Sequence, residues 1–249
     1  MKLYYWSVCE VCKGVGDKKM EMTESVEEIT INDPELEPLK KHLVHKQNYL
    51  AIKRVIDIIG AVVGCILSIP FILFVGLAIK IESKSLMAKV FFVQERVGKD
   101  GKIFKMIKFR SMHEDAEARL KEILHKNEIK GAMFKMKNDP RVTKVGRFIR
   151  KTSIDELPQF FNVLVGDMSL VGPRPPLMRE VVQYKEKDKG RLLVKPGITG
   201  LWQATVRNDA DFDVMVKLDL RYIKELSFKT DMKILLKTIL VVIHPNGAY

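Results

Sequence analysis

The sequence predicts an α+β fold that is mostly helical, in which one membrane helix precedes a compact domain containing a small β-hairpin. Residues Ile58–Ile79 form a run of 22 residues without a charge, which is long enough for a helix to cross the apolar core of a bilayer. Two strand-like segments flank Asp100-Gly101, a pair typical of a tight hairpin turn. Apolar residues at helical spacing dominate much of the remaining chain.

The chain of 249 residues divides into three regions. Residues 1–50 are weakly patterned, with nine Asp or Glu against seven Lys or Arg, and predict a partly disordered N-terminal extension with one short helix before Tyr49. Residues 51–82 contain the membrane helix, and residues 83–249 form the compact domain. The formal net charge of the whole chain is +12, so residues 51–249 carry a net charge of +14. A basic domain suits nucleic acid, anionic lipid or phosphorylated substrates, and charge alone does not choose among them.

Cysteine usage and the first residues indicate a reducing, cytoplasmic setting. The chain has three cysteines, and no second pair accompanies the C-x-x-C of Cys9 and Cys12, so neither a disulfide framework nor a zinc site is expected. Residues 1–20 lack an apolar core, so no cleavable signal peptide is expected.

The membrane segment admits three interpretations. Pro70 lies near its middle, where it removes a backbone hydrogen bond and kinks a helix, and the Ser68 hydroxyl can satisfy the freed carbonyl in lipid. Basic residues flank both ends, which favours the cytoplasmic side for each. A re-entrant hairpin of two half-helices fits both facts, a kinked transmembrane helix fits the proline, and a buried helix of a soluble protein is the third interpretation. The flanking residues are Lys53, Arg54, Lys80, Lys84 and Lys89.

The compact domain is predicted from its turns and its periodicity. Strands are expected at residues 88–97 and 103–110. The last predicted helix, 231–243, is apolar over much of its surface, which suits either the membrane interface or the core. Further helices are predicted at residues 114–127, 153–165 and 212–226, and rigid loops at 172–176 and 196–200.

Two adjacent carboxylates, Asp155 and Glu156, form the most informative stretch of the chain. Pro158 has no N–H and belongs in the first turn of a helix, so a helix is predicted to begin near residues 153–155. Both carboxylates then lie at a positive helix end, where anions bind, and they are candidates for catalysis. The alternative is structural, because Ser153-x-x-Glu156 also matches a capping box.

A cluster of cations accompanies the carboxylates. Arg174 is the most informative, because Pro173 and Pro175 stiffen the backbone on both sides and a guanidinium pairs bidentately with phosphate oxygens. Exposed Lys and Arg side chains are otherwise common on protein surfaces. The other cationic residues considered for phosphate binding are Lys108, Arg110, Arg147, Arg150, Lys151 and Arg207.

Several functional templates are absent from the sequence. No Gly-x-Gly-x-x-Gly or Walker loop is present, and the five histidines show no metal-ligand spacing. Asp209-Ala210-Asp211 matches the short D-x-D pattern with which many nucleotide-sugar transferases hold a metal. Asp211 suits the N-cap of the next helix equally well.

Six motifs follow the apolar run in a fixed order. They are Lys108-Phe109-Arg110-Ser111-Met112, Asp139-Pro140-Arg141-Val142-Thr143, Thr152-Ser153-Ile154-Asp155-Glu156-Leu157-Pro158-Gln159, Asn162-Val163-Leu164-x-Gly166-Asp167-Met168-Ser169, Val171-Gly172-Pro173-Arg174-Pro175 and Pro196-Gly197-Ile198-Thr199-Gly200-Leu201-Trp202-Gln203. In this order they resemble the bacterial sugar transferase family, the monotopic polyprenol-phosphate phosphoglycosyltransferases. The resemblance covers residues 50–249.

The resemblance implies a re-entrant membrane helix, a catalytic domain on the cytoplasmic face of the bacterial plasma membrane, and Mg²⁺ as cofactor. By matching position, Asp155 is expected to be the nucleophile and Glu156 a magnesium ligand. The residues expected to bind the substrate phosphates are Lys108, Arg150, Arg174 and Arg207.

The resemblance also implies a reaction. A hexose-1-phosphate passes from a UDP-sugar to polyprenyl (undecaprenyl) phosphate through a covalent phospho-sugar aspartate, giving polyprenyl-diphosphate-sugar and UMP. This is the first membrane step of capsule, exopolysaccharide or glycoconjugate assembly. Gly200–Gln203 and Gly247–Tyr249 look most like glucose- or galactose-phosphate transferases. The expected partners are the UDP-sugar, polyprenyl phosphate and membrane lipids, without nucleic acid, and a homodimer is left open.

The sequence departs from the family pattern at three points. Ile69 separates Ser68 from Pro70, whereas family members often have the serine directly before the proline. Val206 replaces the usual glycine before Arg207. The extra transmembrane helices of long family members are absent, so a short form is expected.

Two other functions compete with the phosphoglycosyltransferase. A direct glycosyltransferase would use Asp209 and Asp211 to hold a metal and would release a nucleoside diphosphate. A membrane-tethered basic module would bind nucleic acid or anionic lipid, with strong salt dependence and no turnover.

Overall fold

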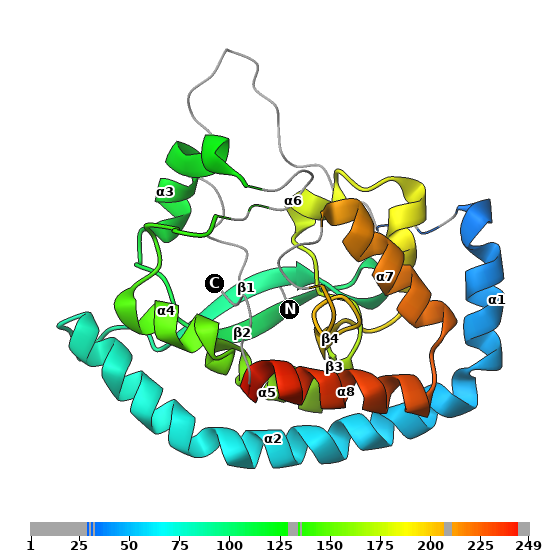
Figure 1. Ribbon diagram of the computed structural model, residues 1–249, viewed down its shortest axis with the longest axis horizontal. Coiled ribbons are helices and arrows are strands. Elements are labelled where there is room, and N and C mark those ends of the chain that lie inside the picture. The colour runs from blue at the N-terminus through cyan, green and yellow to red at the C-terminus, as the bar shows by residue number, and fades with distance from the viewer. Residues whose placement is uncertain are drawn as a thin grey trace, which may run out of the picture.

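The computed structural model of the protein (Figure 1) describes residues 29, 31, 33–128, 134, 136–206 and 211–243. Its helices are α1 (Glu37–His45), α2 (Gln47–Glu82), α3 (Ala116–Ile123), α4 (Lys144–Lys151), α5 (Gln159–Val165), α6 (Met178–Val181), α7 (Phe212–Lys224) and α8 (Phe228–Ile243). Its strands are β1 (Phe91–Val97), β2 (Ile103–Phe109), β3 (Ser169–Val171) and β4 (Gly197–Thr199). The predicted mostly helical fold with a small β-hairpin is confirmed. Cys9, Cys12 and most of the predicted extension lie outside the described residues.

β1 and β2 form the predicted antiparallel hairpin. Its turn places Asp100 and Gly101 at φ 55° and 80°, left-handed conformations that glycine and aspartate adopt more readily than most residues. Directly opposed side chains of a hairpin project from the same face. Arg96 lies opposite Phe104, which precedes Lys108 by four residues, so Arg96 and Lys108 share one face.

The structure contains short elements that periodicity does not predict. β3 and β4 form a separate parallel sheet of two strands, although residues 197–199 were predicted as part of a rigid loop. α4 was also missed, and it begins where the Thr143 side chain accepts a hydrogen bond from the Gly146 N–H at 2.9 Å. Three-residue strands and eight-residue helices are too short for an apolar period to stand out.

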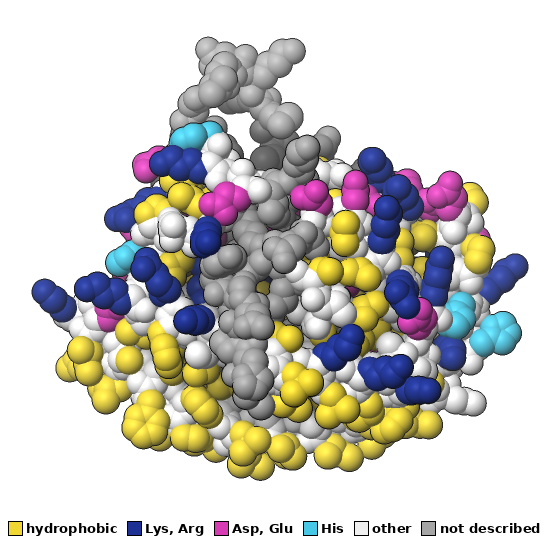
Figure 2. Space-filling view, in the orientation of Figure 1, with side chains coloured by type: hydrophobic (Ala, Val, Ile, Leu, Met, Phe, Trp, Pro, Cys, Tyr) yellow, Lys and Arg dark blue, Asp and Glu magenta, His cyan; other side chains and the backbone are white. Residues whose placement is uncertain are grey.

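α2 is one continuous, curved helix that lies along the base of the molecule in Figure 1. Its concave side packs against the domain through buried residues that include Ala61, Gly64, Ser68 and Ile79. Among the described helices it is long and apolar enough to cross a membrane. Its convex side belongs to the apolar base seen in Figure 2. The exposed residues of α2 include Ile59, Leu67, Leu73, Phe74 and Leu77.

The predicted break of this helix into two half-helices at Pro70 does not occur, and two local features account for a bend instead. Pro70 is exposed and cannot donate to the carbonyl of Ile66, which favours curvature at that point. The Ser68 hydroxyl donates to the Gly64 carbonyl at 2.6 Å, and back-bonding of this kind bends helices. The sequence had suggested that Ser68 satisfies the carbonyl that the proline frees. Its hydroxyl instead bonds to the Gly64 carbonyl, so that prediction is wrong.

A glycine lets α2 approach α5 closely. A Cβ atom on Gly64 would lie 2.5 Å from the ring of Phe160, which is closer than a side chain can pack. Since Phe160 also lines the cavity described below, the approach at Gly64 helps to set one wall of that cavity.

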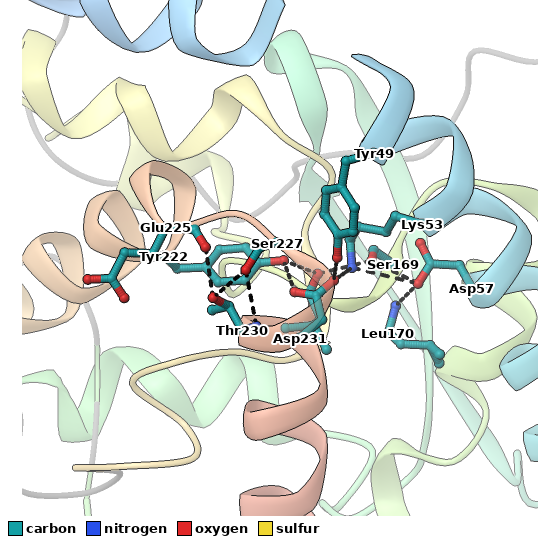
Figure 3. A network of polar contacts seen from close by, with 11 residues as sticks. Tyr49, Lys53, Asp57, Ser169, Leu170, Tyr222, Glu225, Ser227, Thr230 and Asp231 are labelled. Carbon is teal, nitrogen blue, oxygen red and sulfur yellow. Dashed lines mark hydrogen bonds and ion pairs between the residues drawn. The ribbon is translucent and has the colours of Figure 1, made fainter. Parts of the chain in front are cut away.

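A buried polar network holds the first turns of α2 against the domain (Figure 3). Asp231, at the start of α8, accepts hydrogen bonds from the Tyr49 hydroxyl at 2.6 Å, from Lys53 Nζ at 2.6 Å and from the Tyr222 hydroxyl at 2.9 Å. These contacts join α2, α7 and α8 at one carboxylate.

A second carboxylate extends the network toward β3. Asp57 accepts hydrogen bonds from the Ser169 hydroxyl and the Leu170 N–H, each at 3.0 Å, and lies 3.9 Å from Lys53 Nζ. The neighbouring Arg54 donates to the last carbonyls of α5 at 2.6 and 2.9 Å. Both N-terminal flanking cations of the membrane segment are therefore bound within the protein.

We expect Lys53→Met to destabilise the fold by about 3–5 kcal/mol, because it leaves two buried carboxylates without their shared cation. Denaturant unfolding of the purified protein in detergent measures this difference. Lys229→Met removes an exposed lysine and should change the free energy of unfolding by less than about 0.5 kcal/mol. Equal stability of the two variants would show that the network does not anchor α2.

Candidate active site

A cavity of about 580 Å³ lies between the inward face of the β1–β2 hairpin, the segment that joins α4 to α5, and the loops that follow β3 and precede α7. Its polar wall contains five of the residues singled out in the sequence, Lys108, Arg150, Asp155, Glu156 and Arg174. Its apolar wall comes from α2, α5 and α8, through Phe71, Phe160, Val241 and Val242. Arg207 lies outside the described residues. Ser68 and Pro70 do not line the cavity, although Phe71 does.

The carboxylate pair lies on a 3-10 turn, Ile154–Glu156, rather than at the start of an α-helix. The predicted helix start near residues 153–155 is wrong, because Ser153 adopts a left-handed conformation with φ 57° and α5 begins only at Gln159. The Ser153 side chain makes no capping hydrogen bond. Glu156 Oε1 instead accepts a hydrogen bond from Lys108 Nζ at 2.8 Å. The capping-box alternative is therefore wrong as well.

The two carboxyl groups have opposite electrostatic environments. Burial raises the pKa of Asp155 to about 6; Lys108 opposes this rise, and the neighbouring Glu156 charge adds to it. For Glu156 the desolvation that also raises its pKa is outweighed by Lys108, Arg174 and Arg96, so the pKa falls below its usual value. Asp155 is 8% exposed and the Glu156 side chain is 36% exposed, so Asp155 is the harder of the two to ionise.

Other sequence candidates lie away from this site. Arg110 pairs with Glu114 and Ser83, and neither it nor Arg147 nor Lys151 lines the cavity. Lys108 and Arg174 are the cations that act most strongly on the ionised Glu156.

Polar residues that the sequence patterns did not assign to the site also line the cavity, among them Arg96, Trp202 and Gln203. Trp202 Nε1 and Gln203 Oε1 are buried and have no hydrogen-bond partner among the described residues, so they are available to a ligand. Trp202 and Gln203 belong to a motif that was recognised without a role. Arg96 could have been found from the strand alternation, which places it on the face of Lys108.

The carboxylate pair fits magnesium only together with a phosphorylated ligand. Among the described residues no group of three or more His, Cys, Asp or Glu side chains gathers. Mg²⁺ prefers oxygen ligands and is commonly held by one or two carboxylates with substrate phosphates. Asp155 and Glu156 therefore supply a suitable donor set for a metal that arrives with a phosphate.

The alternative D-x-D metal site gains no support in the described part of the chain. Asp209 is not described, and Asp211 occupies the N-cap position of α7 without a capping side-chain hydrogen bond. Asp211 is not among the residues that line the cavity.

The cavity combines paired carboxylates, several cations and an apolar wall, and it lies beside a helix that is long and apolar enough to cross a membrane. A site of this class suits phosphorylated, amphipathic substrates. The chain belongs to the bacterial sugar transferase family, whose model matches residues 48–245.

Curated relatives share a large part of the sequence. The galactosyl transferase CpsE of Streptococcus agalactiae is 46% identical, over 94% of this chain and 49% of its own length. The undecaprenyl-phosphate galactose phosphotransferase of Salmonella typhimurium is 43% identical, over 83% and 45%. The UDP-glucose:undecaprenyl-phosphate glucose-1-phosphate transferase of Escherichia coli is 39% identical, over 80% and 41%. The chain thus spans about half the length of these relatives.

Proposed function

We propose that the protein transfers a hexose-1-phosphate from a UDP-sugar to undecaprenyl phosphate or a similar polyprenyl phosphate, giving polyprenyl-diphosphate-sugar and UMP. The observation that carries this proposal is the cavity, in which Asp155 and Glu156 lie among cations while α2 and α8 supply an apolar wall. The polar part suits the phosphates of both substrates, and the apolar part suits the lipid. Family membership and the names of the relatives support the same reaction.

The chemistry assigned to Asp155 is nucleophilic. One carboxylate oxygen attacks the sugar-proximal phosphorus, and the bond from that phosphorus to the bridging oxygen breaks, so UMP leaves with the electron pair. The sugar-phosphate is then bound to Asp155 as a mixed anhydride. An oxygen of the lipid phosphate attacks the same phosphorus, which frees the carboxylate and forms the diphosphate product.

The cations and Glu156 stabilise the negative charge that this step involves. Lys108, Arg150 and Arg174 offset the negative charge of the transferring group, and Lys108 also fixes Glu156 through Oε1. Glu156 would hold Mg²⁺ with its other oxygen, and the bound metal would neutralise charge on the phosphates.

The biological setting follows from the relatives and is part of the proposal. We place the reaction at the first membrane step of capsule or exopolysaccharide assembly, with glucose or galactose as the transferred sugar.

The identity of the nucleotide that is released, UMP or UDP, tests this function. Purified protein with Mg²⁺, undecaprenyl phosphate and either UDP-glucose or UDP-galactose should release UMP in proportion to the lipid product. Release of UDP would support direct glycosyl transfer, and no turnover with any UDP-sugar would favour a basic binding module.

We further infer that α2 lies in one leaflet of the membrane, with both of its ends on the cytoplasmic side. Contacts with the domain continue from Lys53 near its start to Ile79 near its end, so a straight span would draw the charged domain into the bilayer. The apolar convex face of α2 and the exposed face of α8 then form the membrane-facing base. The exposed apolar residues of α8 include Leu236, Ile239 and Leu240.

Cysteine labelling tests this topology. In a variant without the three native cysteines, single cysteines replace the exposed residues Val44 and Met87, just outside the two ends of α2. A membrane-impermeant maleimide should label both in inverted vesicles and neither in intact spheroplasts. Labelling of the two positions from opposite sides would establish a transmembrane span instead.

A further inference from the structure

Three arginines of the described chain are more than nine-tenths buried, and one of them differs from the other two. Arg141 and Arg191 are 6% and 3% exposed, and each forms an ion pair, with Asp139 at 2.6 Å and with Asp219 at 2.5 Å. Arg96 is 7% exposed and forms an ion pair with none of the described carboxylates. A buried charge without a counter-ion is costly, so Arg96 calls for an explanation.

Neutral acceptors hold the Arg96 guanidinium in place. Nη1 donates to the carbonyl of Pro175 at 2.9 Å, and Nη2 donates to Gln94 Oε1 at 2.7 Å. Nε is buried and has no partner among the described residues. The side chain lines the cavity, so its orientation is fixed while part of its hydrogen-bonding capacity remains unused.

A second guanidinium lies close to Arg96 in the cavity wall. Burial, followed by the charge of Arg174, lowers the pKa of Arg96 to about 9, although Glu180 and Glu156 act in the opposite direction. The Glu180 carboxylate is engaged by the Leu177 N–H at 2.9 Å, and Glu156 is engaged by Lys108. Because both carboxylates that act on Arg96 are bonded elsewhere, a bound anion would stabilise its charge, and Arg174 lies in the same cavity wall.

We propose that Arg96 and Arg174 form a paired guanidinium site that binds the phosphoryl oxygens of a substrate. The identity of the substrate rests on the proposed function, which offers two sources of this chemistry, the diphosphate of the nucleotide sugar and the phosphate of the lipid. Because planar guanidinium groups bind phosphate oxygens bidentately, a fixed pair provides directional contacts at a small ordering cost.

Arg96 also contacts the loop that carries Arg174, since its Nη1 donates to the Pro175 carbonyl and the neighbouring Val97 N–H donates to the Pro176 carbonyl at 2.9 Å. These contacts suggest a purely structural alternative, in which Arg96 braces the loop. A role as a brace and a role as a phosphate ligand predict opposite results for the ligand-free protein. Loss of a brace lowers its stability, whereas removal of a buried charge without a counter-ion leaves the stability unchanged or raises it.

The experiment uses the full chain in nanodiscs and the variants Arg96→Met, Arg96→Lys and, as a matched control, Arg221→Met, which removes an exposed cation. Isothermal titration calorimetry measures binding of UDP and of inorganic pyrophosphate in the presence of Mg²⁺. Acceptor kinetics measure the KM for undecaprenyl phosphate. Thermal unfolding is followed with and without UDP.

We expect Arg96→Met to weaken UDP and pyrophosphate binding about tenfold or more, with no loss of ligand-free stability and a reduced UDP-induced rise in Tm. Arg96→Lys should lie between the parent and Arg96→Met, and Arg221→Met should match the parent. An unchanged affinity for UDP with a raised KM for the lipid would support the site and assign it to the lipid phosphate.

Unchanged affinities for UDP and pyrophosphate together with an unchanged KM for undecaprenyl phosphate would overturn the inference. A parent that binds neither anion and does not use the lipid would overturn it as well. A ligand-free Tm that falls in Arg96→Met while the UDP-induced rise persists would also overturn it, in favour of a brace. If Arg96→Met does not fold, the brace is established and the affinities of Arg96→Lys decide whether a phosphate contact exists beside it. Binding of UDP and pyrophosphate is measured without turnover, so failure of this site is seen even if the proposed reaction fails. The lipid arm alone requires turnover.

Discussion

Asp155→Asn should lower the rate of turnover at least about 10³-fold, which corresponds to ~4 kcal/mol of transition-state stabilisation. The amide preserves the shape of the side chain but cannot attack phosphorus. The release of UMP from the preferred UDP-sugar measures this loss. Binding of UDP should remain close to that of the parent, since the cations that hold its phosphates are unchanged.

The stability of the same variant separates catalysis from a structural role. Burial raises the pKa of Asp155 from 3.8 to about 6. The folded protein therefore binds this proton more tightly than the unfolded chain does, and it loses stability as the pH rises between these two values. The rise corresponds to about 3 kcal/mol above pH 6. Asparagine removes that cost, so Asp155→Asn should be no less stable than the parent at pH 7.5. A variant that is less stable but still active would contradict the assignment of Asp155 as nucleophile.

Glu156→Gln should lower the rate about 100-fold and raise the Mg²⁺ concentration needed for half-maximal activity, because an amide oxygen is a poorer ligand for Mg²⁺ than a carboxylate. Lys108 also loses the carboxylate that it binds at 2.8 Å. Titration of the rate with Mg²⁺ measures both effects.

Glu156→Asp provides the matched control, since it keeps the charge with a shorter side chain. It should retain more activity than Glu156→Gln, and excess Mg²⁺ should restore part of the rate of both variants. A Glu156→Gln enzyme with the parental Mg²⁺ dependence would remove Glu156 from the metal site.

Local chemistry made parts of the fold predictable. The β-hairpin was expected because Asp100-Gly101 suits a left-handed turn, and the last two helices were expected from their apolar period. The start of the helix after Ser153 was misplaced, because Pro158 fixes its own backbone but does not prevent Ser153 from turning left-handed before it. The curvature of α2 was mistaken for a break, since the sequence does not show how the domain packs along its concave side.

The candidate site was predictable where residues are near one another in the chain, and less so where the fold brings them together. Asp155, Glu156 and Arg174 were identified from local patterns. Arg96 was missed, because its burial and its contact with Pro175, 79 residues away, depend on tertiary structure. The same holds for the anchoring of α2, where Lys53 bonds to Asp231 across 178 residues.

The most direct test of the account is whether sugar-phosphate becomes attached to Asp155. Enzyme incubated with Mg²⁺ and a UDP-sugar carrying ³²P in the sugar-proximal phosphate, without lipid acceptor, should release up to one UMP per active site. It should also retain the label on the peptide that contains Asp155, and later addition of undecaprenyl phosphate should transfer the label to lipid. If UMP appears only when the lipid acceptor is present, and no labelled peptide is found after rapid quenching, the two-step mechanism through Asp155 is contradicted.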